Sequence, residues 1–142
     1  MTAQRPSENG GLIEEALTGS VIGCFYDVHR ELGFGYRELI YALALERALV
    51  AKGHRVDREV AVMVYFRGEA LARQTLDMVV DDKLVLELKS TERLPVDATQ
   101  QLFGYLCGTN LQVGLLLHFG KQPRFYRVVY ENRFKHRRGG NQ

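Results

Sequence analysis

The stretch Thr75-Leu76-Asp77-Met78-Val79-Val80, followed after a short connection by Leu84-Val85-Leu86-Glu87-Leu88-Lys89, decides the fold of this 142-residue chain. Both segments are apolar enough to be strands that are covered on both faces of a sheet. The connection over residues 81–83 is short enough for a hairpin. Antiparallel pairing centred on residue 82 predicts that Asp77 and Glu87 are neighbours near one edge of the sheet.

Three charged side chains in this hairpin indicate a functional site. Glu87 and Lys89 point to the same face of their strand, and Asp77 opposes them from the other strand. A carboxylate and an ammonium group on a covered face are costly if left dry and unpaired, which favours a cleft or a bound ion. Two adjacent carboxylates suit Mg²⁺, which takes one or two carboxylates and keeps several waters. A structural salt bridge is the alternative interpretation.

Hydrophobic periodicity predicts the elements around the hairpin. Helical spacing indicates two helices before it, and a period of two indicates strands. The expected elements are a helix ending at Leu32, a helix over about 38–52, strands over 56–66, 72–80 and 84–90, a helix over about 97–107, and strands over 113–119 and 125–130. The order α-α-β-β-β-α-β-β predicts a mixed α/β domain of the α+β kind, with a central mixed sheet flanked by helices.

Two local features of these elements make specific predictions. Alternation places Val56 and Val60 on one face of the first strand and Glu59 on the other. Asp97 is the expected N-cap of the third helix, with Gln100 at the capping-box position.

Two polar pairs lie on predicted helices. Glu38 and Tyr41, in Gly35-x-x-Glu38-x-x-Tyr41, share one helix face, although a glutamate in a first turn also simply favours the helix dipole. The glycines before Glu38 resemble the start of a dinucleotide-binding loop, but the third glycine is missing and a helix precedes them, which excludes that interpretation. Gln101 and Tyr105 share a face of the third helix, and an ordinary polar stripe is the alternative.

Taken together, the motifs resemble the GxxExxY protein family of the PD-(D/E)XK nuclease superfamily. The resemblance covers roughly residues 12–130. It rests on Gly35-x-x-Glu38-x-x-Tyr41, Asp77, Glu87-Leu88-Lys89 and Gln101-x-x-x-Tyr105, in this order. It implies a single-domain restriction-endonuclease-like fold whose common core has the order α-β-β-β-α-β.

The resemblance also implies an activity, the hydrolysis of phosphodiester bonds in nucleic acid, with DNA favoured over RNA. Asp77 and Glu87 would bind Mg²⁺ or Mn²⁺, and the Leu88 carbonyl would add a ligand. Lys89 would be catalytic, positioning or activating the attacking water and stabilising the developing phosphate charge.

Three further residues receive roles from the same resemblance. Glu38 would complete the catalytic site, directly or through a metal-bound water. Gln101 and Tyr105 would border the metal and the phosphate. The chain departs from the family pattern in having Leu76 rather than proline before Asp77. It also has His118 near the last apolar strand where the family has asparagine, and we expect a hydrogen-bonded strand-end histidine there.

The charge distribution favours a polyanion as partner. Residues 1–92 have a formal net charge of −4 and residues 93–142 of +6, and arginine outnumbers lysine 14 to 5. Arginine is the better bidentate phosphate ligand. The residues expected to contact nucleic acid are Tyr41, Arg93, Arg124, Arg127, Arg133 and Lys135. A solvated basic tail is the alternative interpretation.

Size and composition predict one globular domain. The chain has a mass of 16.2 kDa and is 46% hydrophobic. We expect a flexible N-terminus over 1–11, a nuclease-like domain over 12–132 and a basic flexible tail over 133–142. No apolar run is long enough for a membrane span, and no signal-peptide pattern is present, which predicts a cytoplasmic protein. Cys24 and Cys107 are too few to hold an iron–sulfur cluster.

Three functions remain open at this point. A nuclease is favoured by the two acids beside a lysine, which a pure binding module does not need. A catalytically weak nucleic-acid-binding or scaffolding module on the same fold is the alternative, favoured by the small size. An enzyme acting on another phosphate-containing substrate would use the same metal site. So small a domain is also compatible with a homodimer.

Overall fold

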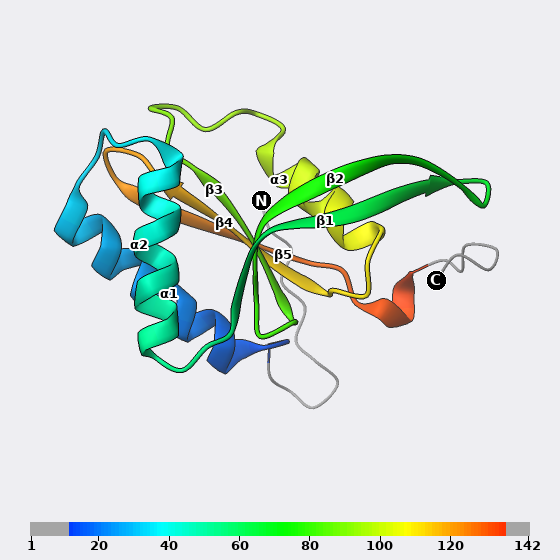
Figure 1. Cartoon of the computed structure of the whole chain (residues 1–142), viewed down its shortest axis with the longest axis horizontal. Coiled ribbons are helices and arrows are strands. Elements are labelled where there is room, and N and C mark those ends of the chain that lie inside the picture. The colour runs from blue at the N-terminus through cyan, green and yellow to red at the C-terminus, as the bar shows by residue number, and fades with distance from the viewer. Residues whose placement is uncertain (1–11, 136–142) are drawn as a thin grey trace.

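The computed structural model describes residues 12–135, and within that range the chain forms a five-stranded sheet between helices (Figure 1). In chain order the elements are α1 (Glu15–Leu32), α2 (Glu38–Ala51), β1 (Val56–Phe66), β2 (Glu69–Val80), β3 (Leu84–Lys89), α3 (Ala98–Cys107), β4 (Val113–Phe119), β5 (Pro123–Val129) and the short 3-10 helix η1 (Asn132–Phe134). The predicted order α-α-β-β-β-α-β-β and the mixed α/β class are confirmed. The N-terminus over 1–11 and residues 136–142 of the expected tail lie outside the described residues.

The strands follow one another across the sheet in the order β1-β2-β3-β4-β5. Neighbouring strands are antiparallel except β3 and β4, which are parallel and are connected through α3. The pairs Met78↔Leu86 and Val80↔Leu84 confirm a hairpin centred on residue 82. The hairpin does not lie at the sheet edge as expected, because β1 pairs with β2 on its outer side.

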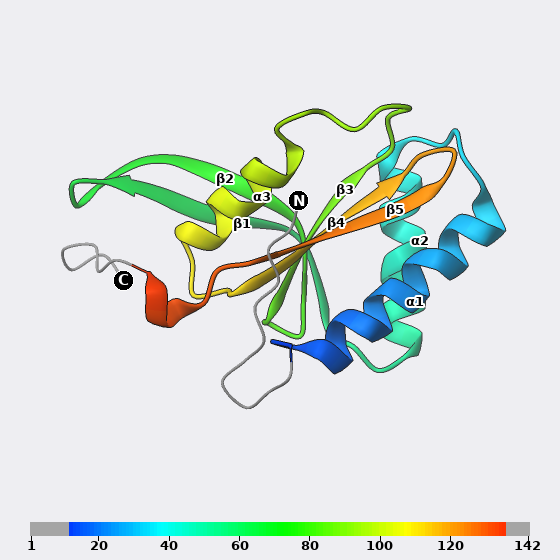
Figure 2. The same ribbon diagram turned by 180° about the vertical axis from the view of Figure 1, so that it is seen from behind.

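Helices α1 and α2 lie on one face of the sheet and α3 on the other (Figures 1 and 2), and a buried cluster lies beneath each layer. Helices α1 and α2 pack on one face against inward side chains such as Leu86 and Leu115. Helix α3 packs on the other face against the alternate residues, such as Val85 and Leu116. Since β3 and β4 are covered on both faces, their residues are apolar except Glu87, Lys89 and His118.

Strands β1 and β2 extend beyond the rest of the sheet as a two-stranded arm, residues 60–75 (Figure 1). β2 pairs with β1 over its whole length but with β3 only from Met78 to Val80. Most side chains of the arm are exposed. Asp77 is therefore the residue at which β2 leaves the body of the sheet.

The arm begins where the pleat alternation breaks, which corrects the expected single face of the first strand. Val56 packs with the α1–α2 cluster, whereas Val60 and Val62 pack with the α3 cluster. Between them, Glu59 has a φ of 54°, in the left-handed region that non-glycine residues rarely adopt. This one residue reverses the faces of β1, which a pattern of alternation cannot reveal.

The expected cap of α3 is not formed. Asp97 precedes the helix, but its side chain makes no hydrogen bond to the backbone of the first turn, so there is no capping box with Gln100. Its carboxylate instead accepts a hydrogen bond from Gln101 Nε2 at 3.3 Å. The predicted end of the first helix at Leu32 is confirmed, and the next residue, Gly33, has a φ of 74° and donates its N–H to the His29 carbonyl.

Candidate active site

The carboxylates of Asp77 and Glu87 lie where β2 and β3 separate. The pair Met78↔Leu86 is the last in the ladder, so Asp77 and Glu87 follow directly on the two strands. Asp77 Oδ2 accepts the backbone N–H of Leu88 at 2.8 Å. The aspartate side chain thus replaces the ladder bond that the departing strand gives up, and this fixes its position beside β3.

Glu87 is the most unusual polar group of the site. It is only 7% exposed, on the face of β3 that α3 covers. Its Oε2 lies 3.5 Å from the Nζ of Lys89, while its Oε1 is buried and has no hydrogen-bond partner. Desolvation, and then the charge of Asp77, raise the pKa of Glu87 to about 7. An orphaned, buried carboxylate oxygen beside a second carboxylate is a position that a cation would satisfy.

Glu38 and Tyr105 approach the same carboxylates from the two helical layers. Glu38 is the first residue of α2, and its pKa is raised by desolvation and then by the charge of Asp77. Tyr105 lies on α3, and its pKa is raised by desolvation and then by the charges of Glu87 and Asp77. The structure therefore brings Glu38 and Tyr105 into the electrostatic environment of the hairpin site.

Gln101 lies one helical turn before Tyr105 and is exposed. Its side-chain amide donates a hydrogen bond to Asp97 and therefore does not bond Asp77 or Glu87. Nucleic acid or water could reach this amide, but the structure gives it no contact with Glu87 or Asp77.

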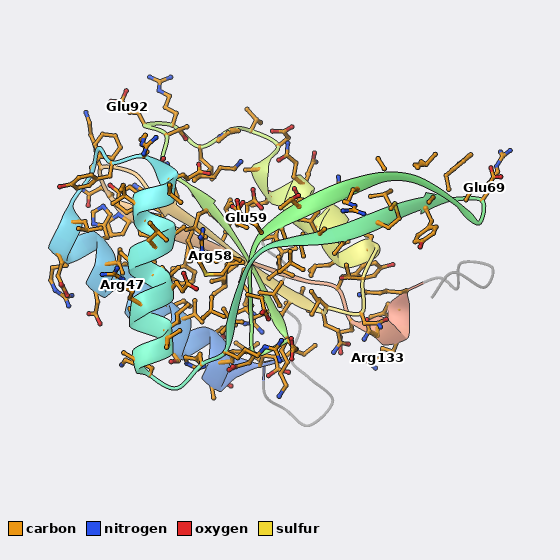
Figure 3. All side chains as sticks on the ribbon, in the orientation of Figure 1. Arg47, Arg58, Glu59, Glu69, Glu92 and Arg133 are labelled. Carbon is orange, nitrogen blue, oxygen red and sulfur yellow. The ribbon has the colours of Figure 1, made fainter. Side chains whose placement is uncertain are left out.

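Sequence reasoning missed Glu59 as a member of the site. The pairs Arg58↔Met78 and Val60↔Leu76 bracket Glu59 and Asp77, which are thus opposite one another in β1 and β2. Figure 3 shows Glu59 where the arm leaves the sheet, while its neighbour Arg58 points toward α2. The charge of Glu59 contributes to the raised pKa of Asp77. The only sequence signal was an acid in a valine-rich strand, and its left-handed backbone could not be foreseen.

The donor set fits a hydrated divalent cation. No group of three or more His, Cys, Asp or Glu side chains able to hold a metal occurs within residues 12–135. Mg²⁺ does not need such a group, because one or two carboxylates and several waters suffice. Asp77 and Glu87 supply two carboxylates, and the free Oε1 of Glu87 is the observation that favours a cation there.

Two of the arginines expected to contact nucleic acid are exposed. Arg93 is in the loop between β3 and α3. Arg124 lies on β5 in one transverse row with His118 and Lys89, because Lys89 pairs with His118 and His118 with Arg124. His118 Nε2 makes a 2.7 Å hydrogen bond with the Thr91 carbonyl, as expected for a satisfied strand-end histidine.

Two other residues expected to contact nucleic acid are buried, which corrects those predictions. Tyr41 is 0% exposed, stacks on Phe119 and donates its hydroxyl to the Gly33 carbonyl. Arg127 is 4% exposed and donates to Thr18 Oγ1 at 3.0 Å, on the α1 side of the sheet. Both side chains hold the fold together. Their residue types indicated phosphate binding, but strand and helix parity turned them inward.

The basic residues at the end of the described range have local partners. Arg133 is half-exposed, and its Nε lies 3.3 Å from Glu131 Oε1. Lys135 Nζ donates to the carbonyls of Thr109 and Leu111 at 2.8 and 2.7 Å, which anchors the chain after α3. Desolvation lowers the pKa of Lys135 to about 8. The role of Lys135 in the structure is thus to bind backbone carbonyls rather than to extend into solvent.

The site thus consists of two acids and a lysine on an inner hairpin of a mixed sheet, with helices over both faces. The sequence matches the family model of the PD-(D/E)XK nuclease superfamily over residues 15–128. The chain therefore belongs to this superfamily, whose nucleases generally use divalent metal ions and act on nucleic acid.

Comparison with solved structures supports the fold. A structure titled "Crystal structure of SSO0001" is similar with a TM-score of 0.53 and 21% sequence identity. The match covers 83% of this chain and 60% of that one, so this chain spans less than two thirds of its length. A comparison with curated proteins gives no match. In the described part of the chain, no helix is both long and apolar enough to cross a membrane.

Proposed function

We propose that this protein is a divalent-metal-dependent nuclease of the GxxExxY family that hydrolyses phosphodiester bonds of DNA. The observation that carries the proposal is the buried, unpartnered Oε1 of Glu87 beside Asp77 and Lys89. A purely structural ion pair would use both carboxylate oxygens, because a buried oxygen without a partner costs roughly 1–3 kcal/mol. A site that keeps this cost in the free protein is prepared for a cation.

Asp77, Glu87 and the Leu88 carbonyl would hold the metal. The N–H and C=O of one strand residue point to the same side, and the Leu88 N–H points to Asp77. The Leu88 carbonyl therefore faces the side from which β2 has departed. When bound, Mg²⁺ or Mn²⁺ would lower the pKa of a coordinated water and offset negative charge on the phosphate.

Lys89 would act on the reacting groups. Its ammonium lies 3.5 Å from Glu87, which orients it while it retains access to solvent. From there it can donate to the attacking water or to a non-bridging phosphate oxygen, where negative charge increases in the transition state. A lysine held this way is positioned before the substrate binds, so little reorganisation is needed.

The surrounding residues would orient water and phosphate. The raised pKa of Glu38 makes its carboxylate a stronger proton acceptor than an ordinary glutamate, which suits a group that takes a proton from the attacking water. The raised pKa of Tyr105 keeps its hydroxyl protonated, so that it can donate to a phosphate oxygen. Gln101, on the same helix, would contact the substrate from the solvent side, and Arg93 and Arg124 would bind flanking phosphates.

The test combines calorimetry with a cleavage assay. Mg²⁺ and Mn²⁺ are titrated into the wild type and into the double variant Asp77→Asn/Glu87→Gln, and the same samples are incubated with linear and branched DNA and with RNA. We expect metal binding and cleavage in the wild type and neither in the double variant. Asp82→Asn is the matched control, because this exposed acid lies in the same hairpin and asparagine tolerates its φ of 56°.

Each outcome separates the possible functions. Cleavage by the wild type and by Asp82→Asn, but not by the double variant, supports the nuclease. Absence of metal binding in the wild type, even with DNA present, contradicts the metal site and favours a nucleic-acid-binding or scaffolding module. Metal binding without cleavage of any nucleic acid contradicts the nuclease and favours another phosphate-containing substrate.

A further inference from the structure

The outer edge of β1 is an unprotected strand edge. Within the described sheet β1 pairs only with β2, so its other side offers unpaired backbone N–H and C=O groups. Residues 60–66 read Val-Ala-Val-Met-Val-Tyr-Phe, without a charge, a proline or a glycine. Such a run is what β-strand pairing favours, and natural proteins usually interrupt it at an exposed edge.

The other free edges of the same sheet are interrupted in this way. β5 begins with Pro123 and carries the exposed Arg124. The part of β2 that extends past β3 carries Glu69 and Arg73. The pairing of β1 with β2 shifts between Val64 and Tyr65, but the extra residue, Leu71, belongs to β2, so the bulge does not interrupt β1 itself. Charges and proline are thus absent at one edge rather than from the whole sheet.

The arm also exposes large apolar side chains. Leu71 is 64% exposed, and Tyr65 and Phe66 are exposed beside it near the tip. A two-stranded ribbon is marginally stable in water unless a third strand or another surface supports it. The arm extends away from the body of the protein in both views, so the body leaves much of it uncovered (Figures 1 and 2).

We propose that this edge pairs antiparallel with the same edge of a second copy of the chain, joining two sheets through their β1 strands. Residues 60–66 are suited to self-pairing, because no like charges meet in any register. An antiparallel pair of identical strands has two-fold symmetry, so it closes as a dimer. Nucleic acid is a poorer occupant, since this edge supplies no cation and the arm as a whole carries Arg67 and Arg73 against Glu69.

The proposed dimer would place two active sites on one side of the joined sheet. The two-fold axis of an antiparallel strand pair is perpendicular to the sheet, so both α3 faces lie on the same side. Glu59 and Asp77 lie at the base of each arm. Pairing centred on Met63 would separate the two bases by about 26 Å along the strands, at ~3.3 Å per residue. This consequence for DNA rests on the proposed nuclease function, whereas the dimer does not.

The test measures the oligomeric state of the full chain without metal or nucleic acid. Sedimentation velocity is run over a range from about 1 to 200 µM, because so short a ladder predicts a dimer with a micromolar Kd. The edge variant is Ala61→Lys/Tyr65→Lys, and the control is Ala72→Lys on β2. All three positions are exposed, so folding is expected to be kept, which circular dichroism verifies.

We expect dimers of the wild type and of Ala72→Lys, and at least about tenfold weaker association of the edge variant. A wild type that is monomeric throughout the range would overturn the proposal. So would a dimer that both variants weaken equally, since it would form through another surface. Because the measurement omits metal and DNA, its failure leaves the nuclease proposal standing.

Discussion

The two ends of the β2–β3 hairpin both carry acids, but in opposite states. At the turn, Asp81 Oδ2 lies 2.8 Å from His54 Nδ1 and Oδ1 accepts the Arg55 N–H at 2.8 Å. The hydrogen bond from His54 is the main reason that the pKa of Asp81 is lowered. At the open end, desolvation raises the pKa values of Asp77 and Glu87. One hairpin thus holds a fully hydrogen-bonded acid at its turn and, at its open end, two acids with raised pKa values, of which Glu87 has a buried oxygen without a partner.

Residue type alone does not separate the structural end of the hairpin from the functional one. Ser20 Oγ lies 2.7 Å from His54 Nε2, so Ser20, His54 and Asp81 have the order of a hydrolase triad. Ser20 is inside α1, however, where backbone N–H groups serve the helix and cannot stabilise an oxyanion. The three residues connect α1, the loop after α2 and the hairpin turn. Their complete hydrogen bonding agrees with a structural role. At the other end, the unpartnered oxygen of Glu87 indicates a cation site because a second carboxylate lies beside it, whereas the structural Arg127 also has a buried Nε without a partner and no such neighbour in this site.

The largest effect is expected from removing the lysine at the open end. Lys89→Ala should reduce the turnover rate by ~10²- to 10³-fold, because it removes a donor aimed at the charge that develops in the transition state. Metal affinity should fall little near pH 8, since the carboxylates remain. Single-turnover cleavage and calorimetry measure the two quantities. Lys121→Ala, which removes an exposed lysine paired with Glu92, is the control, and equal rates for both variants would exclude Lys89 from the mechanism.

The next effect concerns stability, and it follows from the raised pKa of Glu87. A group with a folded-state pKa of about 7 and an ordinary value of 4.5 stabilises the fold below pH 4.5 and loses that contribution as the pH rises through 7. In EDTA, Glu87→Gln should therefore be more stable than the wild type by about 1–3 kcal/mol near pH 8. The two should be nearly equal at pH 4.5. Denaturant unfolding at both pH values measures this, and a less stable variant at pH 8 would show that the carboxylate is structural.

At the turn the same kind of substitution should act in the opposite direction. Asp81→Asn should lower the free energy of unfolding by about 1 kcal/mol near neutral pH, because it weakens the bond to His54. The pKa of Asp81 is lowered, so its contribution is present above pH 3.8 and disappears as the pH falls through the folded-state value. Wild type and variant should converge in acid. Cleavage by the folded variant should be unchanged, and a large loss of activity would contradict the structural assignment.

The fold could be predicted from the sequence because local patterns and chain order agree. The apolar strands around residue 82 fixed the register of the hairpin, and that register placed Asp77 beside Glu87. The position of Lys89 followed from parity. These properties depend on periodicity and short connections, which sequence records directly.

The errors arose where a long-range feature overrode the local pattern. Tyr41 and Arg127 have side chains suited to phosphate, but both point into the core, and burial depends on packing partners far away in the chain. The capping of α3 failed because the Asp97 side chain bonds Gln101 instead. At Glu59 the side chains of β1 change from one face of the sheet to the other, because this residue has a left-handed backbone conformation. No residue type in the sequence indicates that conformation.

Glu59 gives the smallest expected effect, and it tests how far the open end of the β2–β3 hairpin extends as a cation site. It opposes Asp77 but is exposed, so its charge should act on a bound cation through solvent rather than as a ligand. Glu59→Gln should weaken Mg²⁺ binding by about 2- to 5-fold, corresponding to ~0.5–1 kcal/mol, and the effect should shrink at high salt. Glu59→Gly should weaken binding equally and be at least as stable, because glycine adopts the left-handed conformation without strain. Calorimetry at two salt concentrations measures this. Loss of binding as complete as in Glu87→Gln would instead make Glu59 a direct ligand and extend the unsatisfied end of the hairpin to β1.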